Sequence, residues 1–250
     1  MYKKIVTKIN SISLILKWPD LTGYAMRTRA CIFDLDGVIV DTARYHYMAW
    51  ERLAEKLGIH FTYTDNERLK GVSRMASLDI ILELGGLKLS GSEKEELAAQ
   101  KNQWYVEYIS KMTPEEILPG TLDFITELKR NKIKIALGSA SKNTPLILDR
   151  VGINNLFDAI ADGNNVTKAK PDPEVFVRAA EMAGVEPSRC VVFEDAIAGV
   201  EAARNAGMIC IGIGDPNVLI DAHMVIKGLN EMNINKLISL EKQLGNEGLI

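Results

Sequence analysis

With 250 residues, the chain is long enough to bury a full core, either as one α/β domain or as a core with a small cap. Its 47% hydrophobic and 25% charged residues are typical of globular proteins, and a net charge of −3 excludes a global basic field for nucleic acid or anionic membranes. Any anion that the protein handles must therefore be held by a local group of residues.

The first 25 residues carry lysines followed by a short apolar patch at residues 12–16, which resembles the start of a secretion signal. Residues 17–19, Lys-Trp-Pro, interrupt this patch at once. We therefore expect that Met26 is the functional start and that residues 1–25 are an N-terminal extension rather than a signal.

Three cysteines, Cys31, Cys190 and Cys210, show no spacing typical of a metal site, so we expect reduced core thiols. No apolar run approaches the roughly 18 residues that a membrane span requires. These two features favour a cytoplasmic protein without a membrane partner, and the net charge of −3 argues against a nucleic-acid partner.

From residue 30 onward, short apolar runs alternate with amphipathic segments. Strands are expected at residues 30–33, 132–137, 158–161, 190–193 and 209–213, with a weaker edge strand at 224–226. Helices are expected near residues 120–130, 144–151, 173–183 and 196–206. This alternation predicts an α/β fold with a doubly wound, Rossmann-like parallel sheet, whose chemistry belongs at the carboxyl ends of the strands.

Residues 42–118 break this rhythm, because they contain apolar stripes at helical spacing and no convincing strand. Ser92 and Glu95 predict a capping box that opens a long helix. We therefore expect an all-helical cap domain at 42–118, inserted into a core domain formed by residues 26–41 and 119–250.

Asp34 and Asp36 stand at the end of the first expected strand, and Gly37 lets the chain leave the sheet sharply. Two acids two residues apart project to the same side of an extended chain. Taken alone, such a pair fits a solvated turn as well as it fits a catalytic site.

Polar residues recur at three later strand ends. Ser139 can hold phosphate oxygens or cap a helix, and Lys170 before Pro171 is either a rigidly held cation or a surface charge. Glu194 and Asp195 form a hard oxygen site suited to Mg²⁺, or the acidic first turn of a helix. Their recurrence at four strand ends favours one shared phosphate and metal site.

This ordered set resembles the haloacid dehalogenase-like superfamily of phosphotransferases, over about residues 29–230. The resemblance implies that Asp34 is a nucleophile that becomes phosphorylated, that Asp36 is the general acid/base, and that Ser139 and Lys170 bind phosphate. A covalent intermediate splits the transfer into two steps, and a cation offsets the repulsion between carboxylate and phosphate. The implied Mg²⁺ ligands are Asp34, Glu194, Asp195 and the backbone carbonyl of Asp36.

The expected cap carries a second group of functional candidates. Thr42, His46 and Trp50 are spaced at i, i+4 and i+8, so they lie along one helix face, where plain packing is the alternative. Residues 69–74 place a glycine turn between two cations and can hold a second phosphate. Lys101 can support that site or be a solvated lysine. A mutase that passes through a bisphosphate needs two phosphate sites, whereas a phosphatase needs one.

Four runs, DLDGVIVDTARYHYMAW, LKGVSR, KIALGSASKN and FDAIAD, resemble the β-phosphoglucomutase family. This resemblance implies interconversion of β-D-glucose 1-phosphate and glucose 6-phosphate through β-glucose 1,6-bisphosphate, with Thr42 and His46 helping to place Asp36. The implied substrate- and phosphate-binding residues are Trp50, Lys70, Gly71, Val72, Ser73, Arg74, Ser77, Lys101, Ser139, Ala140, Ser141, Lys142, Asn143 and Lys170.

Three small residues depart from the family pattern: Gly138 replaces a more usual Ala, Ala169 a small hydroxyl residue, and Ala196 a Ser. The main alternative activity is a Mg²⁺-dependent sugar-phosphate phosphatase that uses the same Asp34. The intact acids and Lys170 argue against a non-catalytic binding module. We expect a monomer that acts on a small sugar phosphate, and the exact hexose stays open.

Overall fold

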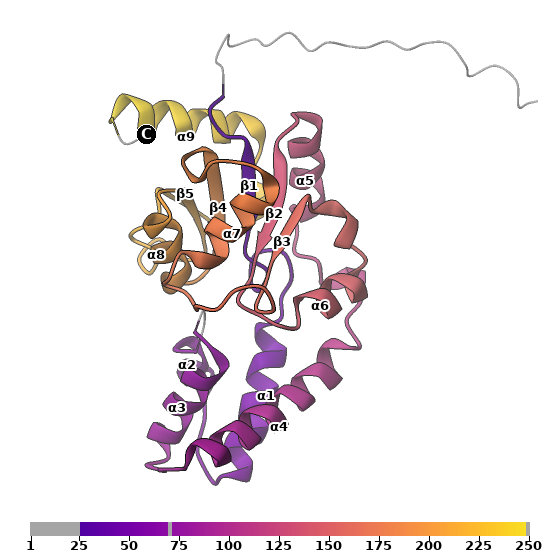
Figure 1. Cartoon of the computed structure of the whole chain (residues 1–250), viewed down its shortest axis with the longest axis vertical. Coiled ribbons are helices and arrows are strands. Elements are labelled where there is room, and N and C mark those ends of the chain that lie inside the picture. The colour runs from indigo at the N-terminus through magenta and orange to yellow at the C-terminus, as the bar shows by residue number, and fades with distance from the viewer. Residues whose placement is uncertain (1–25, 70–71, 249–250) are drawn as a thin grey trace, which may run out of the picture.

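The computed structural model describes residues 26–69 and 72–248. The expected N-terminal extension, residues 1–25, and the Lys70-Gly71 turn lie outside the described residues. Figure 1 shows a sheet flanked by helices in the upper part of the molecule and a separate group of helices, α1 to α4, below it.

The central sheet has six strands, all parallel, in the order β3-β2-β1-β4-β5-β6. The strands are β1 (Ala30–Phe33), β2 (Lys134–Gly138), β3 (Ala159–Ala161), β4 (Cys190–Glu194), β5 (Ile209–Ile213) and β6 (Met224–Ile226). The doubly wound parallel sheet is therefore confirmed. The expected start of the second strand at Lys132 is wrong, because Lys132 takes a positive φ of 59° in the turn that precedes β2.

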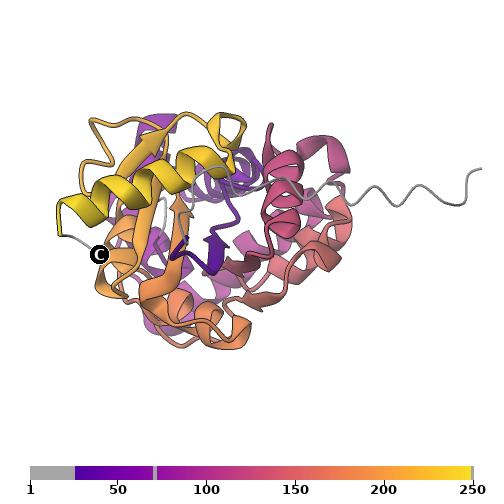
Figure 2. The same cartoon turned by 90° about the horizontal axis from the view of Figure 1, so that it is seen from above.

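Successive strand residues point to opposite faces of the sheet, and each face has its own helical cover. Phe33 packs with the helices α5, α6 and α9 on one face, and Ile32 packs with α7 and α8 on the other. These helices are α5 (Thr121–Arg130), α6 (Thr144–Val151), α7 (Glu174–Ala183), α8 (Ile197–Asn205) and α9 (Ile234–Asn246). Figure 2 shows α9, which was not among the expected helices, lying across the upper end of the molecule.

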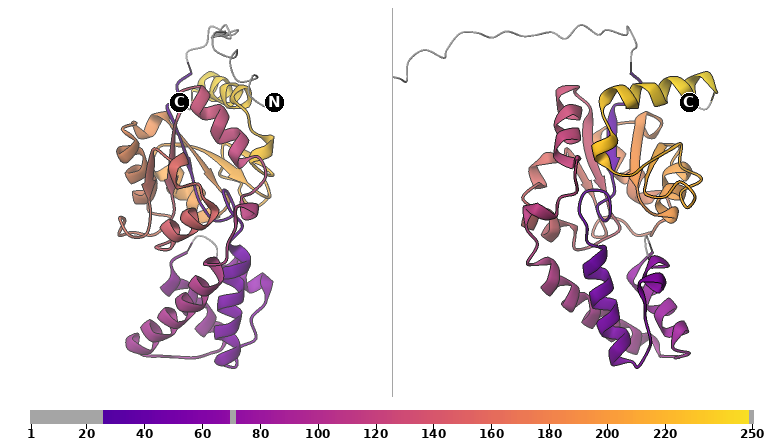
Figure 3. Two further views of the ribbon diagram at one scale, coloured as in Figure 1. Left: turned by 90° about the vertical axis from the view of Figure 1, so that its right-hand side faces the viewer. Right: turned by 180° about the vertical axis from the view of Figure 1, so that it is seen from behind.

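The inserted segment is helical, as expected. Its helices are α1 (Ala43–Lys56), α2 (Tyr63–Glu67), α3 (Arg74–Leu84) and α4 (Gly91–Ile109). They share a small core of their own, which includes Trp50, Leu53, Leu78 and Ile81. Figure 3 shows from two further sides that these helices extend away from the sheet. None of the helices in the described ranges is long and apolar enough to cross a membrane.

The capping box at the start of α4 lies two residues earlier than expected. Ser90, not Ser92, caps the helix: its hydroxyl accepts from Glu93 N at 3.4 Å, and the Glu93 carboxylate accepts from Ser90 N at 2.8 Å. Both serines are followed by a Glu at the required spacing, so the local pattern is ambiguous. Leu89 packs against the core of the inserted helices and thereby sets where the chain turns into the helix.

The two chain segments that join the inserted helices to the sheet run side by side. Val40 forms an isolated bridge with Ile117, and Leu118 N donates to Ile39 O at 2.9 Å. Farther out, Arg44 pairs with Glu116 at 2.7 Å. These contacts tie both connections together just below the carboxyl ends of the strands.

Candidate active site

The site lies where the direction of the sheet winding reverses. β1 is paired with β2 on one side and β4 on the other, so the connections that follow these strands leave in opposite directions and open a crevice beyond β1. A cavity of about 530 Å³ occupies this position, between the sheet and the inserted helices. Core residues that line it include Asp34, Asp36 and Asp195, and those from the inserted helices include Trp50, Arg74 and Lys101.

Lys170 joins two carboxylates at the bottom of the site. Its Nζ lies 2.5 Å from Asp34 Oδ1 and 2.8 Å from Glu194 Oε2, and all three side chains are buried. Burial alone would lower the pKa of Lys170, but the two carboxylates raise it above its ordinary value. The lysine is therefore a permanent cation that offsets the buried negative charge.

Packing explains why Gly138 stands where the family pattern more usually has Ala. A Cβ at this position would lie 2.7 Å from a ring carbon of Phe176, so only glycine leaves room for that ring. The Phe176 ring centre lies 4.6 Å from Lys170 Nζ. The ring therefore supports the ammonium group through a cation–π contact while it shields it from water.

Three carboxylates meet beside this lysine. Asp34, Glu194 and Asp195 each offer an oxygen, and these oxygens lie within 4.8 Å of one another. Burial and the neighbouring Asp34 raise the pKa of Glu194 to about 7, although Lys170 opposes this. Carboxylate oxygens are the ligands that Mg²⁺ prefers, so the donor set fits the expected metal.

Glycines make this convergence possible. A Cβ on Gly37, whose φ is 78°, would lie 2.3 Å from Asp195 Oδ2, and one on Gly199 would lie 2.2 Å from Glu194 Oε2. Gly37 was singled out from the sequence as a turn residue. Gly199 was missed, because no local pattern indicates that helix α8 passes so close to Glu194.

Asp36 faces the cavity next to Asp34. Its backbone N donates to Asp34 Oδ2 at 3.0 Å, which ties the two acids together. Burial and the Asp34 charge raise the pKa of Asp36 to about 6, and a hydrogen bond donated by the Thr42 hydroxyl to Asp36 Oδ1 opposes this. A carboxyl group with such a pKa can both take and give a proton near neutral pH.

His46 lies next to Lys101 rather than Asp36. Its Nδ1 is 3.0 Å from Lys101 Nζ, and no hydrogen bond joins it to Asp36 within the described residues. Burial, Lys101 and Arg74 lower the pKa of His46 well below its ordinary value, so the ring is neutral. Burial and Arg74 lower the pKa of Lys101 to about 7, although Asp36 opposes this. Lys101 is buried, so the solvated-lysine alternative is wrong.

Two cations, Arg74 and Lys101, line the cavity from the inserted helices. Arg74 begins α3, and Ser73 caps that helix as expected by accepting from Ala76 N at 3.3 Å. Lys101 Nζ lies 4.4 Å from the centre of the Trp50 ring. Further lining residues from this part of the chain are Leu69, Val72, Ser73, Met75 and Ser77. Lys70 and Gly71, also expected here, lie outside the described residues.

The loop after β2 forms the opposite wall. Ala140, Ser141, Lys142 and Asn143 line the cavity, whereas Ser139 is buried beneath them and its hydroxyl accepts from Ser141 N at 3.2 Å. Ser139 therefore does not cap α6, which begins at Thr144. The side chain of Asn143 donates to Asn102 Oδ1 at 3.0 Å and so links this loop to α4, a contact that sequence reasoning missed.

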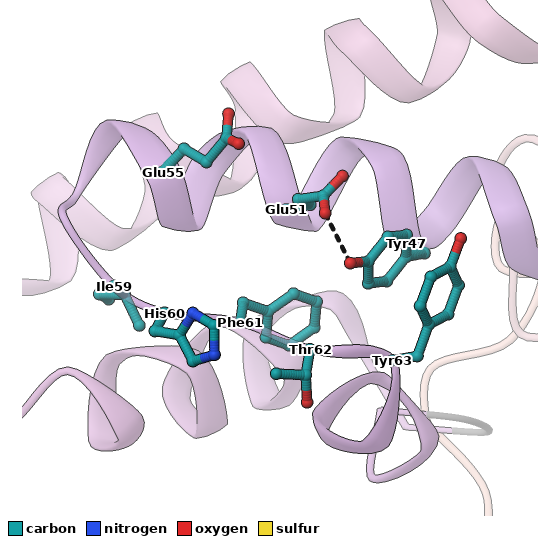
Figure 4. Close-up of a pocket in the computed structure, with 8 residues that line it drawn as sticks. All are labelled: Tyr47, Glu51, Glu55, Ile59, His60, Phe61, Thr62 and Tyr63. Carbon is teal, nitrogen blue, oxygen red and sulfur yellow. Dashed lines mark hydrogen bonds between the residues drawn. The ribbon is translucent and has the colours of Figure 1, made fainter.

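A smaller groove of about 340 Å³ lies among the inserted helices (Figure 4). Tyr47 donates to Glu51 Oε1 at 2.5 Å, and its ring stacks on Tyr63 with centres 3.7 Å apart. The groove shares no lining residue with the larger cavity and contains none of the expected site residues. The candidate catalytic residues that the structure describes therefore belong to the larger cavity.

Comparison with known proteins shows which family the chain belongs to. A haloacid dehalogenase-like hydrolase family model matches residues 28–207. A "Beta-phosphoglucomutase" of Bacillus subtilis is 45% identical over 211 residues, which cover 84% of this chain and 93% of the relative. A crystal structure of beta-phosphoglucomutase from Clostridium difficile has a TM-score of 0.83 and 43% identity, covering 88% of this chain and 99% of that one. A "Phosphorylated carbohydrates phosphatase" of Thermotoga maritima is 31% identical, covering 78% of this chain and 92% of the relative.

Proposed function

Because the chain belongs to the haloacid dehalogenase-like hydrolase family, we propose that it is a β-phosphoglucomutase. It interconverts β-D-glucose 1-phosphate and D-glucose 6-phosphate through a phosphorylated Asp34 and β-glucose 1,6-bisphosphate. Two observations support this choice within the family: the likeness to beta-phosphoglucomutases from Bacillus subtilis and Clostridium difficile, and a cavity lined by cations from both the core and the inserted helices.

The observation that carries the proposal is the second set of cations. Lys170 stands beside Asp34 at the bottom of the cavity, and Arg74 and Lys101 line the side formed by the inserted helices. One phosphate can be transferred at Asp34 while the other is held by the Arg74 guanidinium and the Lys101 ammonium. A substrate with phosphates at both ends of a hexose therefore matches the distribution of charge.

Asp34 acts as the nucleophile. A carboxylate oxygen of Asp34 attacks phosphorus, the bond from phosphorus to the sugar oxygen breaks, and an aspartyl-phosphate forms. Lys170 balances the charge that the phosphoryl group brings next to Asp34 and Glu194. The amides and hydroxyls of residues 139–143, on the facing loop, orient the phosphate oxygens.

Mg²⁺ fits the carboxylates beside this nucleophile. Asp34, Glu194, Asp195 and the Asp36 carbonyl would hold the ion. When bound, it supplies positive charge that reduces the repulsion between the attacking carboxylate and the phosphate. Burial, and to a smaller extent the Asp34 charge, raises the pKa of Glu194, and a divalent cation beside these carboxylates would favour the charged form.

Asp36 moves the proton. It gives a proton to the sugar oxygen that leaves phosphorus, and in the second half of the cycle it takes one from the hydroxyl that is phosphorylated. Thr42 directs its hydroxyl at Asp36 Oδ1 and so holds the carboxyl group in place. His46 acts through Lys101, because its Nδ1 lies 3.0 Å from that ammonium group.

The experiment that tests this function is incubation with β-glucose 1-phosphate, Mg²⁺ and a trace of β-glucose 1,6-bisphosphate. We expect glucose 6-phosphate to form much faster than free phosphate. The alternative is a sugar-phosphate hydrolase that uses the same Asp34, because one relative of the chain is a Thermotoga maritima phosphatase. Free phosphate as the main product would favour that hydrolase and reject the mutase.

A further inference from the structure

Asn66 is a buried polar residue that lines the larger cavity. It belongs to the short helix α2 and is 6% exposed. Its backbone is satisfied, because its N donates to Thr62 O at 3.1 Å and its carbonyl accepts from Leu69 N at 3.0 Å. Its side-chain amide, by contrast, forms no hydrogen bond within the described residues. A buried amide without a partner destabilises the fold, so this position calls for an explanation.

The Asn66 amide is reachable from the cavity. In the described parts of the chain, the buried side-chain atoms that are fully enclosed and lack a hydrogen-bond partner belong to Tyr105 and Thr121. The amide of Asn66 also lacks a partner, but it is not fully enclosed, so a molecule in the cavity can contact it. A polar group in such a place can contribute to binding when the ligand supplies its partner.

Helix α2 holds Asn66 in place through contacts that do not use the amide. Thr62 and Asp65 form a capping box at the start of the helix, in which Asp65 N donates to Thr62 Oγ1 at 3.3 Å and Thr62 N donates to Asp65 Oδ2 at 2.9 Å. The Tyr63 ring stacks on Tyr47 of α1 with centres 3.7 Å apart, in the groove shown in Figure 4. The amide is therefore presented on a supported element, as a binding contact requires.

Ser77 is a second neutral group of this kind. It lies on α3, is 3% exposed and lines the same cavity, and its hydroxyl forms no hydrogen bond within the described ranges. The cations that match the phosphates, Lys170, Arg74 and Lys101, line the cavity as well. Neutral donors and acceptors suit the uncharged part of the substrate, which is the sugar ring with its hydroxyls.

We propose that Asn66 is a specificity-determining residue whose amide hydrogen-bonds to a hydroxyl of the hexose ring. This inference rests on the proposed mutase function and names the part of the substrate that Asn66 recognises. An amide both donates and accepts, so it matches a hydroxyl, which does the same. A substrate without that hydroxyl encloses the amide with no partner, and this disfavours its binding and its reaction.

Two variants of Asn66 remove the amide in different ways. Asn66→Leu nearly keeps the volume, and Asn66→Ala leaves room in the cavity, so a loss common to both is not steric. We expect kcat/KM for β-glucose 1-phosphate to fall about threefold to tenfold in both, the usual effect of one lost hydrogen bond. Phosphorylation of Asp34 by acetyl phosphate, which has no sugar hydroxyl, should stay within about twofold of the wild-type rate.

The stability of these variants separates a binding role from a structural one. The Tm of Asn66→Leu should be unchanged or higher, because the amide has no partner in the folded protein to lose. Asn246→Ala, which changes an exposed asparagine at the end of α9, is the control and should behave like the wild type. An unchanged kcat/KM in both Asn66 variants, or an equal loss with acetyl phosphate, would overturn the proposal.

Analogues of β-glucose 1-phosphate that lack the hydroxyl at C2, C3 or C4 identify the contact. The wild type should lose about tenfold or more in kcat/KM with one of them, because that analogue leaves the amide unpaired. Asn66→Ala should lose less than about twofold further with that analogue and keep the wild-type losses with the others. Full further losses with every analogue would refute the contact. Free phosphate as the wild-type product would instead reject the mutase, so the two failures are distinguishable.

Discussion

At the scale of single residues, Asp34 occupies the most constrained position of the site. Its two carboxylate oxygens are engaged by Lys170 Nζ at 2.5 Å and by the backbone N of Asp36 at 3.0 Å. Both contacts orient the carboxylate at the end of β1, where it lines the cavity. A substitution of Asp34 is therefore expected to affect the reaction more strongly than the stability of the fold.

Asp34→Asn should abolish formation of the phosphoenzyme. An amide neither attacks phosphorus nor ligates a cation well, so turnover should fall by about four orders of magnitude or more. Incubation with β-glucose 1,6-bisphosphate, acid quenching and mass spectrometry measure the phosphorylated protein. Asp123→Asn, an exposed acid on α5, is the control. A phosphoryl group found on another residue would contradict the assignment.

The Lys101 charge predicts a pH dependence of substrate binding. In the empty site, burial and Arg74 lower the pKa of Lys101 to about 7, so the ammonium loses its proton as the pH rises through that value. Phosphate binds the charged form. KM for β-glucose 1-phosphate should therefore increase between pH 7 and 9, by up to about tenfold per pH unit.

Lys101→Arg provides the comparison, because a guanidinium stays charged throughout this range. Steady-state kinetics at constant ionic strength should show a flatter KM profile for this variant than for the wild type, whatever its absolute KM. A wild-type KM that stays constant from pH 7 to 9 would contradict the prediction that Lys101 loses its proton in this range and thereby weakens phosphate binding.

At the scale of elements, the close approach of α8 to the end of β4 decides where Glu194 stands. A Cβ on Gly199 would lie 2.2 Å from Glu194 Oε2, so Gly199→Ala forces this carboxylate to move. Because Glu194 also pairs with Lys170 at 2.8 Å, the shift disturbs both the lysine and the expected metal ligands. We expect weaker Mg²⁺ binding, by about tenfold or more.

Titration of activity with Mg²⁺, together with calorimetric binding of the ion, measures this effect. Gly245→Ala on α9 is the matched control, because a Cβ there meets nothing within 4 Å. That variant should leave Mg²⁺ binding unchanged and stabilise the fold by about 0.5–1 kcal/mol. Equal Mg²⁺ affinity in Gly199→Ala and wild type would show that Glu194 is not held by this packing.

At the scale of the whole molecule, the cavity is built by two parts of the chain that contribute different charges. Asp34 follows β1 and Lys170 lies in the loop between β3 and α7, whereas Arg74 comes from the inserted helices. Only a substrate long enough to reach both uses all of these groups. A small acyl phosphate needs the groups at the end of β1 alone.

Arg74→Ala should therefore separate two classes of substrate. A charge-assisted contact from an arginine to a phosphate stabilises by about 1.5–3 kcal/mol, so kcat/KM for β-glucose 1-phosphate should fall roughly tenfold to a hundredfold. Phosphorylation of Asp34 by acetyl phosphate should change little. Arg68→Ala, which changes the exposed arginine that follows the neighbouring α2, is the control. Equal losses with both substrates would refute the role of Arg74.

Much of the fold and of the chemistry at the strand ends could be predicted from the sequence. Asp34, Asp36 and Lys170 each follow a short apolar run, and the carboxyl ends of parallel strands meet at one edge of the sheet. Their convergence followed from that topology. The helical character of residues 42–118 was equally clear, because apolar spacing of 3 and 4 residues is a local property.

The sequence alone thus determined the type of most elements, though not α9, together with the order of the polar strand ends and the family resemblance, because these are encoded by neighbouring residues. Tertiary structure decided the pairs that matter within the site. Lys170 meets Asp34 across 136 residues, His46 meets Lys101 rather than Asp36, and Ser90 rather than Ser92 caps α4. Such contacts depend on how helices and strands pack against one another, and a local pattern carries no information about that packing.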